Sequence, residues 1–404
     1  MHAHPESELT VNRPSIAVIG AGVVGLSIAR SLSLAGARVT IHERNRIGSG
    51  TSSGTFAWVN SNGKSPDSYH ELNLAGMREH EELQRTSTSE AQWYMQTGTY
   101  EWTTKPEVAE RLQQRVQRLT DAGYPVRKAT TDELRARIPE LRIHPRSSEI
   151  VHFPSEGYLA PSVLLARLWS EAKANGAELR APVDVLDVVE DSSGVTLHLS
   201  TGETWRGDFV VSAVGRWSES MMKTLGKQFA MIDPDLPNKF ACGFLGSTDP
   251  QYVQLSSNLI TPELNVRPDG GGRLLLQTPD LDHRADPAYQ ADTTGLIGQE
   301  MLARLHRLFD NTAGARIERI AVGQRARPAD GLPAVGFVTD AARVYLVATH
   351  SGITLAPLLG RLVSTELLDG ARSPLLHDYA PDRLVGRTVA DFPKFATLHY
   401  PAAQ

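Results

Sequence analysis

The sequence predicts a mixed α/β fold, in which a domain built on a parallel sheet is interrupted by a second domain built on an antiparallel sheet. Three observations favour it. Alternating strand and helix patterns open the chain, a β-rich stretch fills its middle (231–277), and a strand followed by a helix returns near its end. Parallel strands need helical crossovers, so the late strand and helix fit best as completion of the first sheet. With 404 residues, the chain is also long for a single hydrophobic core.

The first unit of the chain has the clearest local pattern. The apolar run 16–19 predicts a strand, and apolar residues at helical spacing over 23–34 predict a helix that ends before Gly36. A second short strand is predicted over 39–42. This β-α-β arrangement is parallel, because the helix returns the chain to the edge where the next strand starts.

The remaining elements follow in order along the chain. Further helices are predicted over 68–86, 106–122, 161–175, 300–309 and 354–368, and further strands over 183–190, 195–200, 209–214 and 344–349. Pieces of one nucleotide-binding domain, scattered on both sides of an inserted domain, explain this order better than two consecutive domains.

The composition limits the classes of function. The chain is 41% hydrophobic and 22% charged with a formal net charge of −5, which argues against binding to nucleic acid or to an anionic membrane. No apolar run reaches the length of a membrane span, and the first residues lack the apolar region of a signal peptide. The single cysteine, Cys242, cannot form an internal disulfide and fits a reducing compartment. We therefore expect a cytoplasmic protein without a metal site.

Gly20, Gly22 and Gly25 form a G-x-G-x-x-G motif between the first strand and its helix. The first glycine permits a tight turn, the second lets the backbone approach a pyrophosphate, and the third lets helix and strand pack closely. Glu43 ends the second strand, where a carboxylate accepts hydrogen bonds from a ribose 2′-hydroxyl and repels a 2′-phosphate. The motif therefore predicts FAD or NAD rather than NADP.

A resemblance to a known family favours FAD over NAD. Four stretches carry it: "VIGAGVVGLSIARSLSLAGARVTIHER", "GYLAPSVLLARLWSEAKANGAEL", "DFVVSAVGRWSESM" and "GQRARPADGLPAVG…VYLVATHSGITLAPLLGRLVSTELL". They resemble the D-amino-acid oxidase-like family of FAD-dependent oxidoreductases, which includes glycine oxidases, sarcosine oxidases and D-amino-acid dehydrogenases. The resemblance implies a Rossmann-type FAD-binding domain with an inserted substrate domain built on an antiparallel sheet.

The predicted division of the chain follows from this resemblance and from the order of the elements. The FAD-binding domain is assigned to 15–86, 148–225 and 318–380, and the substrate-binding domain to 87–147 and 226–317. A flexible N-terminal tail (1–14) and a C-terminal extension (381–404) complete the chain.

The resemblance also implies how the cofactor is held. The backbone of Val185 would meet the adenine, Ala213 and Gly215 would lie close to the cofactor, and the helix that begins at Gly352 would direct its N-terminal amides at the flavin C2 carbonyl. The full expected set is Gly20, Gly22, Val23, Val24, Gly25, Glu43, Arg44, Thr51, Ser52, Val185, Ala213, Gly215, Gly352, Ile353 and Thr354. We expect non-covalent FAD, because Gly323 stands where sarcosine oxidases carry the linking cysteine and the loop "GSGTSSGTFAW" has no histidine.

Arg325 is the first candidate for a catalytic role, because family members use an arginine at this position to bind the substrate carboxylate. His350 stands where glycine oxidases have an arginine; it could bind substrate, transfer a proton, tune the flavin or only cap a strand. Asn265 stands near the position of the substrate-facing tyrosine of glycine oxidases. The stretch 272–277 lacks the lysine that speeds reaction with oxygen in sarcosine oxidases, so oxygen and another electron acceptor both stay open. Candidate pocket walls are Phe56, Trp58 and Asn60.

We expect oxidation of the C–N bond of an amino acid or secondary amine that carries a carboxylate: a D-amino acid, glycine or an N-alkyl amino acid. Hydride transfer to flavin N5 would give an imine, with the protein supplying orientation and electrostatics. One alternative is oxidation of a 2-hydroxy acid, whose carboxylate Arg325 would bind equally well. Another is a flavoprotein subunit or sensor without independent turnover. A homo-oligomer is compatible with the sequence, which does not determine substrate or stereochemistry.

Overall fold

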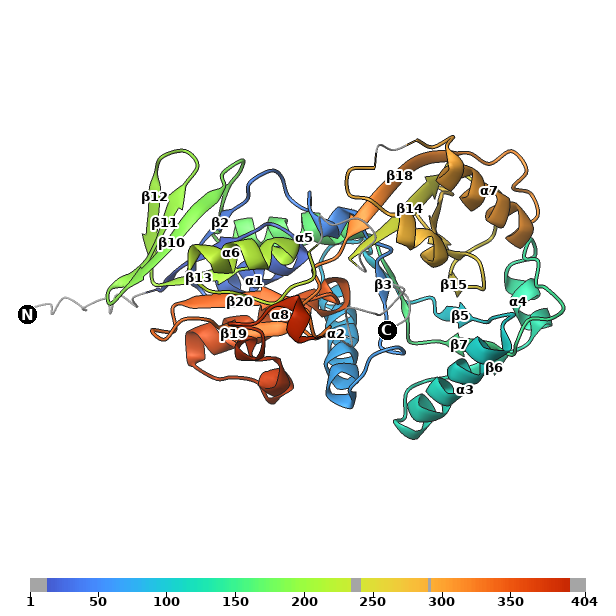
Figure 1. Ribbon diagram of the computed structural model, residues 1–404, viewed down its shortest axis with the longest axis horizontal. Coiled ribbons are helices and arrows are strands. Elements are labelled where there is room, and N and C mark those ends of the chain that lie inside the picture. Colours follow the sequence, from blue (N-terminus) through green and yellow to red (C-terminus); the bar gives the residue numbers. More distant parts are fainter. Residues whose placement is uncertain (1–12, 234–240, 290–291, 393–404) are drawn as a thin grey trace, which may run out of the picture.

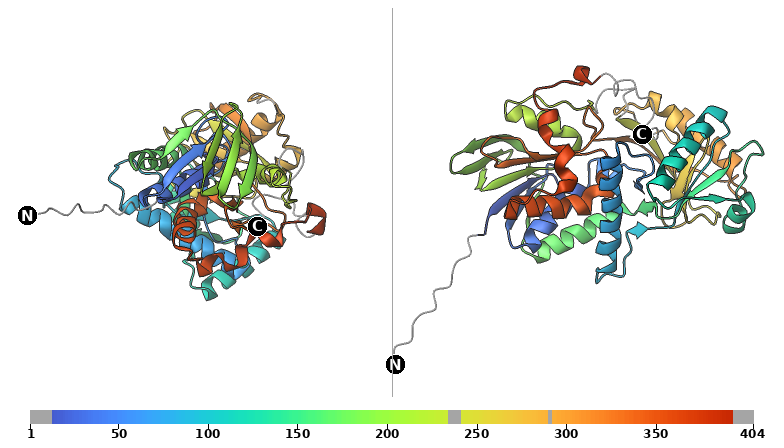
Figure 2. Two further views of the ribbon diagram at one scale, coloured as in Figure 1. Left: turned by 90° about the vertical axis from the view of Figure 1, so that its left-hand side faces the viewer. Right: turned by 90° about the horizontal axis from the view of Figure 1, so that it is seen from below.

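The computed structural model describes residues 13–233, 241–289 and 292–392. The molecule is elongated, with a parallel sheet in one part and a larger, mainly antiparallel sheet in the other (Figure 1). Helix α2 (Asp67–Arg85) stands between the two parts, as Figures 1 and 2 both show. The predicted mixed α/β fold with a parallel and an antiparallel sheet is confirmed.

The first sheet has six strands in the order β19-β20-β13-β1-β2-β9. They are β1 (Ser15–Ile19), β2 (Arg38–His42), β9 (Glu178–Arg180), β13 (Phe209–Ser212), β19 (Ala334–Phe337) and β20 (Val344–Ala348). Every neighbouring pair is parallel except β19 and β20. The carboxyl ends of β1, β2, β13 and β20 therefore meet at one edge, which is where open α/β sheets bind their ligands.

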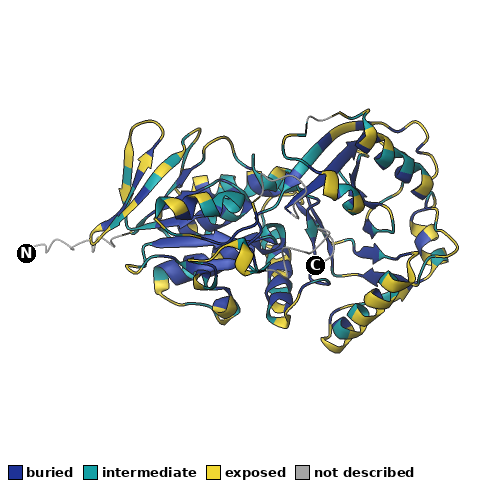
Figure 3. Ribbon diagram, in the orientation of Figure 1, coloured by how far each residue is buried: buried dark blue, intermediate teal, exposed yellow. Residues whose placement is uncertain are grey.

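Both faces of this sheet are covered. Helices α1 (Val23–Leu34), α2, α5 (Pro161–Ala174) and α8 (Gly352–Asp369) share one apolar core on one face. The other face is covered by a three-stranded sheet and by one helix. These elements are β10 (Val185–Asp191), β11 (Gly194–Leu199), β12 (Thr204–Gly207) and α6 (Ser218–Thr224). All five residues of β20 are buried, which agrees with the continuous apolar run of a central parallel strand. Figure 3 shows these strands as a buried layer.

The second sheet has eight strands in the order β18-β14-β17-β16-β15-β5-β7-β6. They are β5 (Thr99–Glu101), β6 (Arg127–Ala129), β7 (Ile150–Phe153), β14 (Cys242–Thr248), β15 (Asn258–Ile260), β16 (Asn265–Pro268), β17 (Leu274–Gln277) and β18 (Ile317–Gln324). Neighbours are antiparallel except β15 and β5. Helix α7 (Leu296–Leu308) shares the core of this sheet, and α3 (Pro106–Asp121) and α4 (Thr131–Arg137) lie toward its β6 end in Figure 1.

A small sheet joins the two parts of the molecule. Strand β8 (Gly157–Leu159) pairs with β3 (Trp58–Val59) on one side and with β4 (Tyr94–Met95) on the other. Short 3-10 turns complete the described elements, at Thr51–Ser53, Gly215–Trp217, Pro279–Arg284, Pro374–Tyr379, Pro381–Arg383 and Val389–Asp391. Among the described residues, no helix has both the length and the apolar character needed to cross a membrane.

Two predicted domain boundaries do not follow the sheets. Strand β7 pairs with β5 and β6 of the large sheet, although the boundary at 148 assigns it to the FAD-binding part. Strand β18 pairs with β14 of the large sheet along its length, although the predicted boundary at 318 assigns it to the FAD-binding part. A short apolar strand does not reveal its partner, because pairing is decided by residues far away in sequence. Of the predicted C-terminal extension, residues 381–392 are described and bury Leu384 in the core, whereas most of the predicted N-terminal tail lies outside the described residues.

Buried histidines make the stability of this fold dependent on pH. His80 of α2 is fully buried, and its Nε2 lies 2.8 Å from the carbonyl oxygen of Ile353 in the first turn of α8. Burial lowers its pKa from 6.5 to about 4, so only the unfolded chain binds a proton here between these values. The free energy of unfolding should therefore fall by about 1.4 kcal/mol per pH unit from this residue alone as the pH drops from 6.5 toward 4.

A His80→Gln variant keeps an N–H donor for Ile353 but cannot titrate. Chemical denaturation at several pH values should show a correspondingly shallower loss of stability below pH 6.5. Equal slopes for wild type and His80→Gln would show that His80 is not the group that titrates.

Candidate active site

A cavity of about 450 Å³ opens where the carboxyl ends of β1, β2, β13 and β20 meet the large sheet. Its lining includes Ile19 at the end of β1, Ala213 after β13 and Thr349 after β20. From the large sheet it includes Gln277 at the end of β17 and Arg325 directly after β18. A ligand in this cavity would therefore touch both parts of the molecule.

The glycines of the first turn are required by close backbone contacts. Gly20 has φ +102°, and a Cβ there would lie 2.7 Å from the carbonyl oxygen of Ala213. A Cβ on Gly25 would lie 2.0 Å from the carbonyl oxygen of Gly20. Gly20 and Gly22 line the cavity, whereas Gly25 does not. The third glycine thus allows α1 to pack on β1, as its position in the motif predicts, but does not itself face the ligand site.

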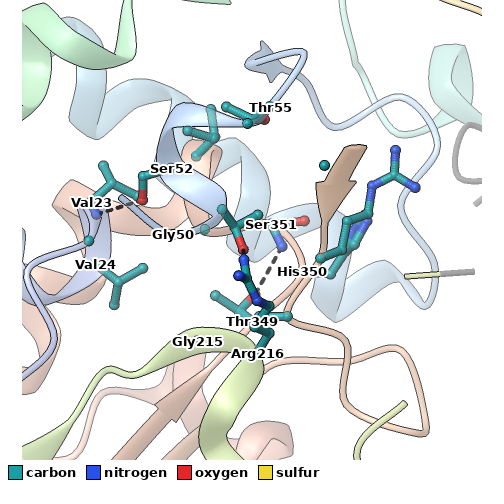
Figure 4. A pocket seen from close by; sticks show the side chains of 18 of the residues that line it. Val23, Val24, Gly50, Ser52, Thr55, Gly215, Arg216, Thr349, His350 and Ser351 are labelled. Carbon is teal, nitrogen blue, oxygen red and sulfur yellow. Dashed lines mark hydrogen bonds between the residues drawn. The ribbon is translucent and has the colours of Figure 1, made fainter. Parts of the chain in front are cut away.

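Helix α1 presents its N-terminus to the cavity. Gly22 is the N-cap and provides no side-chain cap, and the N–H of Val23 donates to Ser52 Oγ at 3.0 Å (Figure 4). Val23, Val24, Thr51 and Ser52 all line the cavity, as the sequence predicts. The positive end of the helix dipole and its backbone donors suit an anionic group such as a pyrophosphate.

Two arginines add positive charge to the same region. The guanidinium carbons of Arg44 and Arg216 lie 3.7 and 3.9 Å from the centroid of the Trp217 ring, and all three residues line the cavity. These distances are those of cation–π contacts, which hold the guanidinium groups in place. Arg44 belongs to the predicted set, whereas sequence reasoning missed Arg216 and Trp217 although both lie in a stretch that carries the family resemblance.

The carboxylate of Glu43 is held by two backbone N–H groups. Its Oε2 accepts a hydrogen bond from the N–H of Ala21 at 2.9 Å, and its Oε1 accepts one from the N–H of Asn45 at 2.8 Å. The carboxylate lines the cavity and retains lone pairs on both oxygens for ligand hydroxyls. This arrangement fits the predicted contact with a ribose.

Helix α8 directs a second N-terminus into the cavity. Gly352, Ile353 and Thr354 form its first turn and line the cavity, and its N-cap Ser351 provides no side-chain cap. A Cβ on Gly352 would lie 3.4 Å from a methyl carbon of Val24, so the N-terminal ends of α8 and α1 nearly touch. Val185, Ala213 and Gly215, which the resemblance assigns to the cofactor, line the same cavity. Two helix N-termini and a fixed carboxylate in one cavity fit FAD, which carries a pyrophosphate, a ribose and a ring with a polar carbonyl edge.

Arg325 lies on the cavity wall with an unsatisfied donor. Its backbone N–H donates to Ala241, whereas its Nη1 is buried and has no hydrogen-bond partner among the described residues. Burial lowers the pKa of Arg325 to about 10; Asp282 opposes this shift and the neighbouring Arg327 contributes to it. The guanidinium remains charged at neutral pH. Because an unpaired buried donor is costly, an anionic ligand group would be stabilised here.

His350 lies between β20 and α8 and also lines the cavity (Figure 4). Burial lowers its pKa well below 6.5, and the positive charges of Arg325, Lys64 and Arg327 lower it further. The imidazole is therefore neutral at pH 7. A neutral ring does not attract an anion by charge, but it can bind substrate through hydrogen bonds, which is one of the roles considered from the sequence.

Asn265 does not line the cavity, so the geometry does not support the predicted catalytic role. It lies opposite Gln277 in the pairing of β16 with β17, and its Nδ2 donates to Gln277 Oε1 at 3.2 Å. Gln277 is the residue of this pair that lines the cavity. The predicted residue, Asn265, thus lies one strand away from the residue that reaches the cavity. Sequence alone does not reveal this, because cross-strand pairing decides which of the two side chains reaches the site. Phe56, Trp58 and Asn60 do line the cavity, as predicted.

Sequence reasoning missed three ionisable groups of this region. Lys64 lines the cavity and is 4% exposed. Glu156 and Asp282 are buried outside the lining, and burial raises the pKa of each to about 7. Trp58 Nε1 and the hydroxyl of Tyr124 both donate to Glu156. No local pattern identifies these residues, because their burial arises from chain segments that are distant in sequence.

A family model described as FAD dependent oxidoreductase (DAO) matches residues 15–365. The chain belongs to this family. The glycine oxidase of Geobacillus kaustophilus is 27% identical over 380 residues, which cover 92% of this chain and 96% of that protein. The glycine oxidase of Pseudomonas aeruginosa is 26% identical over 401 residues and covers 92% and 99% of the two chains.

Solved structures share the fold. A crystal structure of the Geobacillus kaustophilus glycine oxidase has a TM-score of 0.78 and 24% identity and covers 93% of this chain and 100% of that one. An L-proline dehydrogenase from P. horikoshii has a TM-score of 0.76 and 21% identity, with 92% and 97% covered. The predicted family, FAD as cofactor and the oxidoreductase class are confirmed. The individual site residues stay predictions.

Glu43 offers a direct test of the cofactor site. Glu43→Gln keeps the size of the side chain but removes the charge and replaces one acceptor with a donor. The dissociation constant of FAD, measured by fluorescence quenching on the apoprotein, should rise about tenfold, the effect of losing one charge-assisted hydrogen bond. Glu178→Gln, on the exposed edge strand β9 outside the cavity lining, should leave it unchanged. An unchanged affinity for Glu43→Gln would mean that Glu43 only fixes the turn.

Proposed function

We propose that this protein oxidises the C–N bond of an amino acid or secondary amine that carries a carboxylate. The observation that carries the proposal is the buried Nη1 of Arg325, which has no hydrogen-bond partner within the described part of the chain and lies on the wall of the cavity that fits FAD. The relatives named above support it, and so does an iminodiacetate oxidase from Chelativorans sp. with a TM-score of 0.76 and 21% identity. Iminodiacetate is a secondary amine that carries two carboxylates.

The residues of this chain would bind and orient the substrate. Arg325 would hold the carboxylate through two hydrogen bonds and so fix the position of the substrate α-carbon. The side chains of Phe56 and Trp58 would limit access of water, and the neutral His350 would hydrogen-bond to substrate. The N-terminal amides of α8 would stabilise negative charge beside them. When bound, FAD would supply the hydride acceptor for oxidation of the substrate C–N bond to an imine, which water would hydrolyse.

The flavin attachment is proposed to be non-covalent. Gly323 stands at the position compared above with a linking cysteine, and a Cβ there would lie 2.6 Å from the backbone carbonyl oxygen of Gly54. The backbone thus leaves no room for a side chain at this position. Flavin that stays with the polypeptide after acid precipitation would contradict this part of the proposal.

The reaction is tested by anaerobic bleaching of the flavin absorbance. Glycine, sarcosine, proline, both enantiomers of several amino acids and matched 2-hydroxy acids form the panel. We expect amines to bleach the flavin and hydroxy acids to fail, and admission of air then separates an oxidase from a dehydrogenase. Bleaching by hydroxy acids alone would overturn the proposal. Reduction by dithionite alone would favour a subunit or sensor.

Arg325→Met should lower the second-order rate constant of flavin reduction by about 100-fold or more, because a charged pair of hydrogen bonds to the carboxylate is lost. Stopped-flow absorbance measures this rate constant. The matched control is Arg319→Met, an exposed arginine on the same strand, which should reduce the flavin at the wild-type rate. If Arg325→Met retains the wild-type rate, the carboxylate is bound elsewhere.

A further inference from the structure

A second cation stands in the same cavity as Arg325. Lys64 belongs to the loop between β3 and α2, lines the cavity and is only 4% exposed. Its Nζ lies 5.7 Å from the centroid of the Tyr69 ring, on α2. Lysine is rarely buried, so a lysine on the wall of a ligand cavity is an uncommon feature. Its ammonium group offers positive charge and N–H donors to an anionic ligand group.

Lys64 and Arg325 line the same cavity, and their charges act on a shared neighbour, His350. Burial is the main cause that lowers the pKa of Lys64. The positive charges of Arg327 and Arg325 contribute to the same shift. Both Arg325 and Lys64 contribute to the lowered pKa of His350, which therefore lies within reach of both charges. The cations repel each other, and a ligand with two negative charges would relieve that repulsion.

The acidic residues near these cations lie outside the cavity wall. Asp282 acts on Arg325 and Glu156 acts on Lys64, but neither carboxyl group lines the cavity. Glu101 lines it and forms an ion pair with Arg115, which also lines it. Among the described residues that line this part of the cavity, the positive side chains of Lys64, Arg115 and Arg325 thus outnumber the one negative side chain, that of Glu101. A monocarboxylate substrate would use only Arg325.

We propose that the substrate is a dianionic amine, an amino acid or N-alkyl amino acid with a second acidic group, and that Lys64 binds this second group. The inference rests on the proposed function, because it assigns the first carboxylate to Arg325. The two cations suit different tasks. The planar guanidinium of Arg325 fixes the orientation of one carboxylate, and the ammonium group of Lys64 attracts an anion without demanding a fixed orientation. Lys64 is a specificity-determining residue in this scheme.

The test compares acids with amides of the same size. Iminodiacetate and its monoamide differ only in one charge, and so do aspartate and asparagine and glutamate and glutamine, each amino acid as both enantiomers. The measurement is made below pH 7, where Lys64 carries its charge. For at least one of these pairs, the second-order rate constant of anaerobic flavin reduction in the wild type should be at least tenfold higher with the acid than with the amide.

Lys64→Met should remove this preference by lowering the rate constant for the acid, while the rate constant for the amide stays within about twofold of wild type. Lys128→Met, an exposed lysine outside the cavity lining, should keep the preference. FAD content and near-ultraviolet circular dichroism identify a variant that fails to fold. Equal rates for acid and amide in the wild type, or an equal loss for both in Lys64→Met, would overturn the inference.

A binding measurement keeps this inference separate from the proposed reaction. Glutarate and its monoamide carry no amine and cannot be oxidised at a C–N bond, but their binding can be followed through the absorbance of bound flavin. Tighter binding of glutarate that disappears in Lys64→Met supports the dianion site even if no amine bleaches the flavin. If amines bleach the flavin but glutarate and its monoamide bind equally, the proposed function stands and the dianion site is wrong.

Discussion

The close packing of helix α1 on helix α8 is the constraint on which the rest of the structure depends. A Cβ on Gly360 of α8 would lie 2.5 Å from the carbonyl oxygen of Ser27 on α1, so the two backbones touch without an intervening side chain. A Cβ on Gly76 of α2 would lie 2.6 Å from the carbonyl oxygen of Thr354, which brings a third helix equally close. The two helices follow β1 and β20 of one parallel sheet, so this packing brings both N-termini to the same end of it.

Two helix N-termini that open into one cavity give it a fixed polarity before any ligand binds. Backbone N–H groups and helix dipoles cannot turn away, unlike long side chains, and so they cost little reorganisation when an anion arrives. Glu43 is fixed in the same manner by two backbone donors. The cofactor region therefore depends mainly on backbone geometry, which explains why short glycine motifs describe it well.

The opposite region of the cavity depends on side chains from the large sheet. Strand β18 runs from the edge of that sheet to Arg325, and the chain then returns to the six-stranded sheet at β19. The same segment thus connects the two parts of the molecule and places Arg325 on the cavity wall. Carboxyl groups one layer behind the wall oppose part of this positive charge, Asp282 at Arg325 and Glu156 at Lys64.

The sequence by itself determined the nucleotide-binding unit, the fold class and the cofactor, and it predicted as a site residue Arg325, which lines the cavity. These depend on local spacing, on residues such as Gly20 that a short turn demands, or on a motif whose members are close together in the chain. Only the tertiary structure decided that Gln277 rather than Asn265 reaches the cavity, that β7 joins the large sheet and that Lys64 is buried in the site. The physical reason is that strand pairing and burial are set by contacts between segments far apart in sequence, which leave no periodic pattern in any one of them.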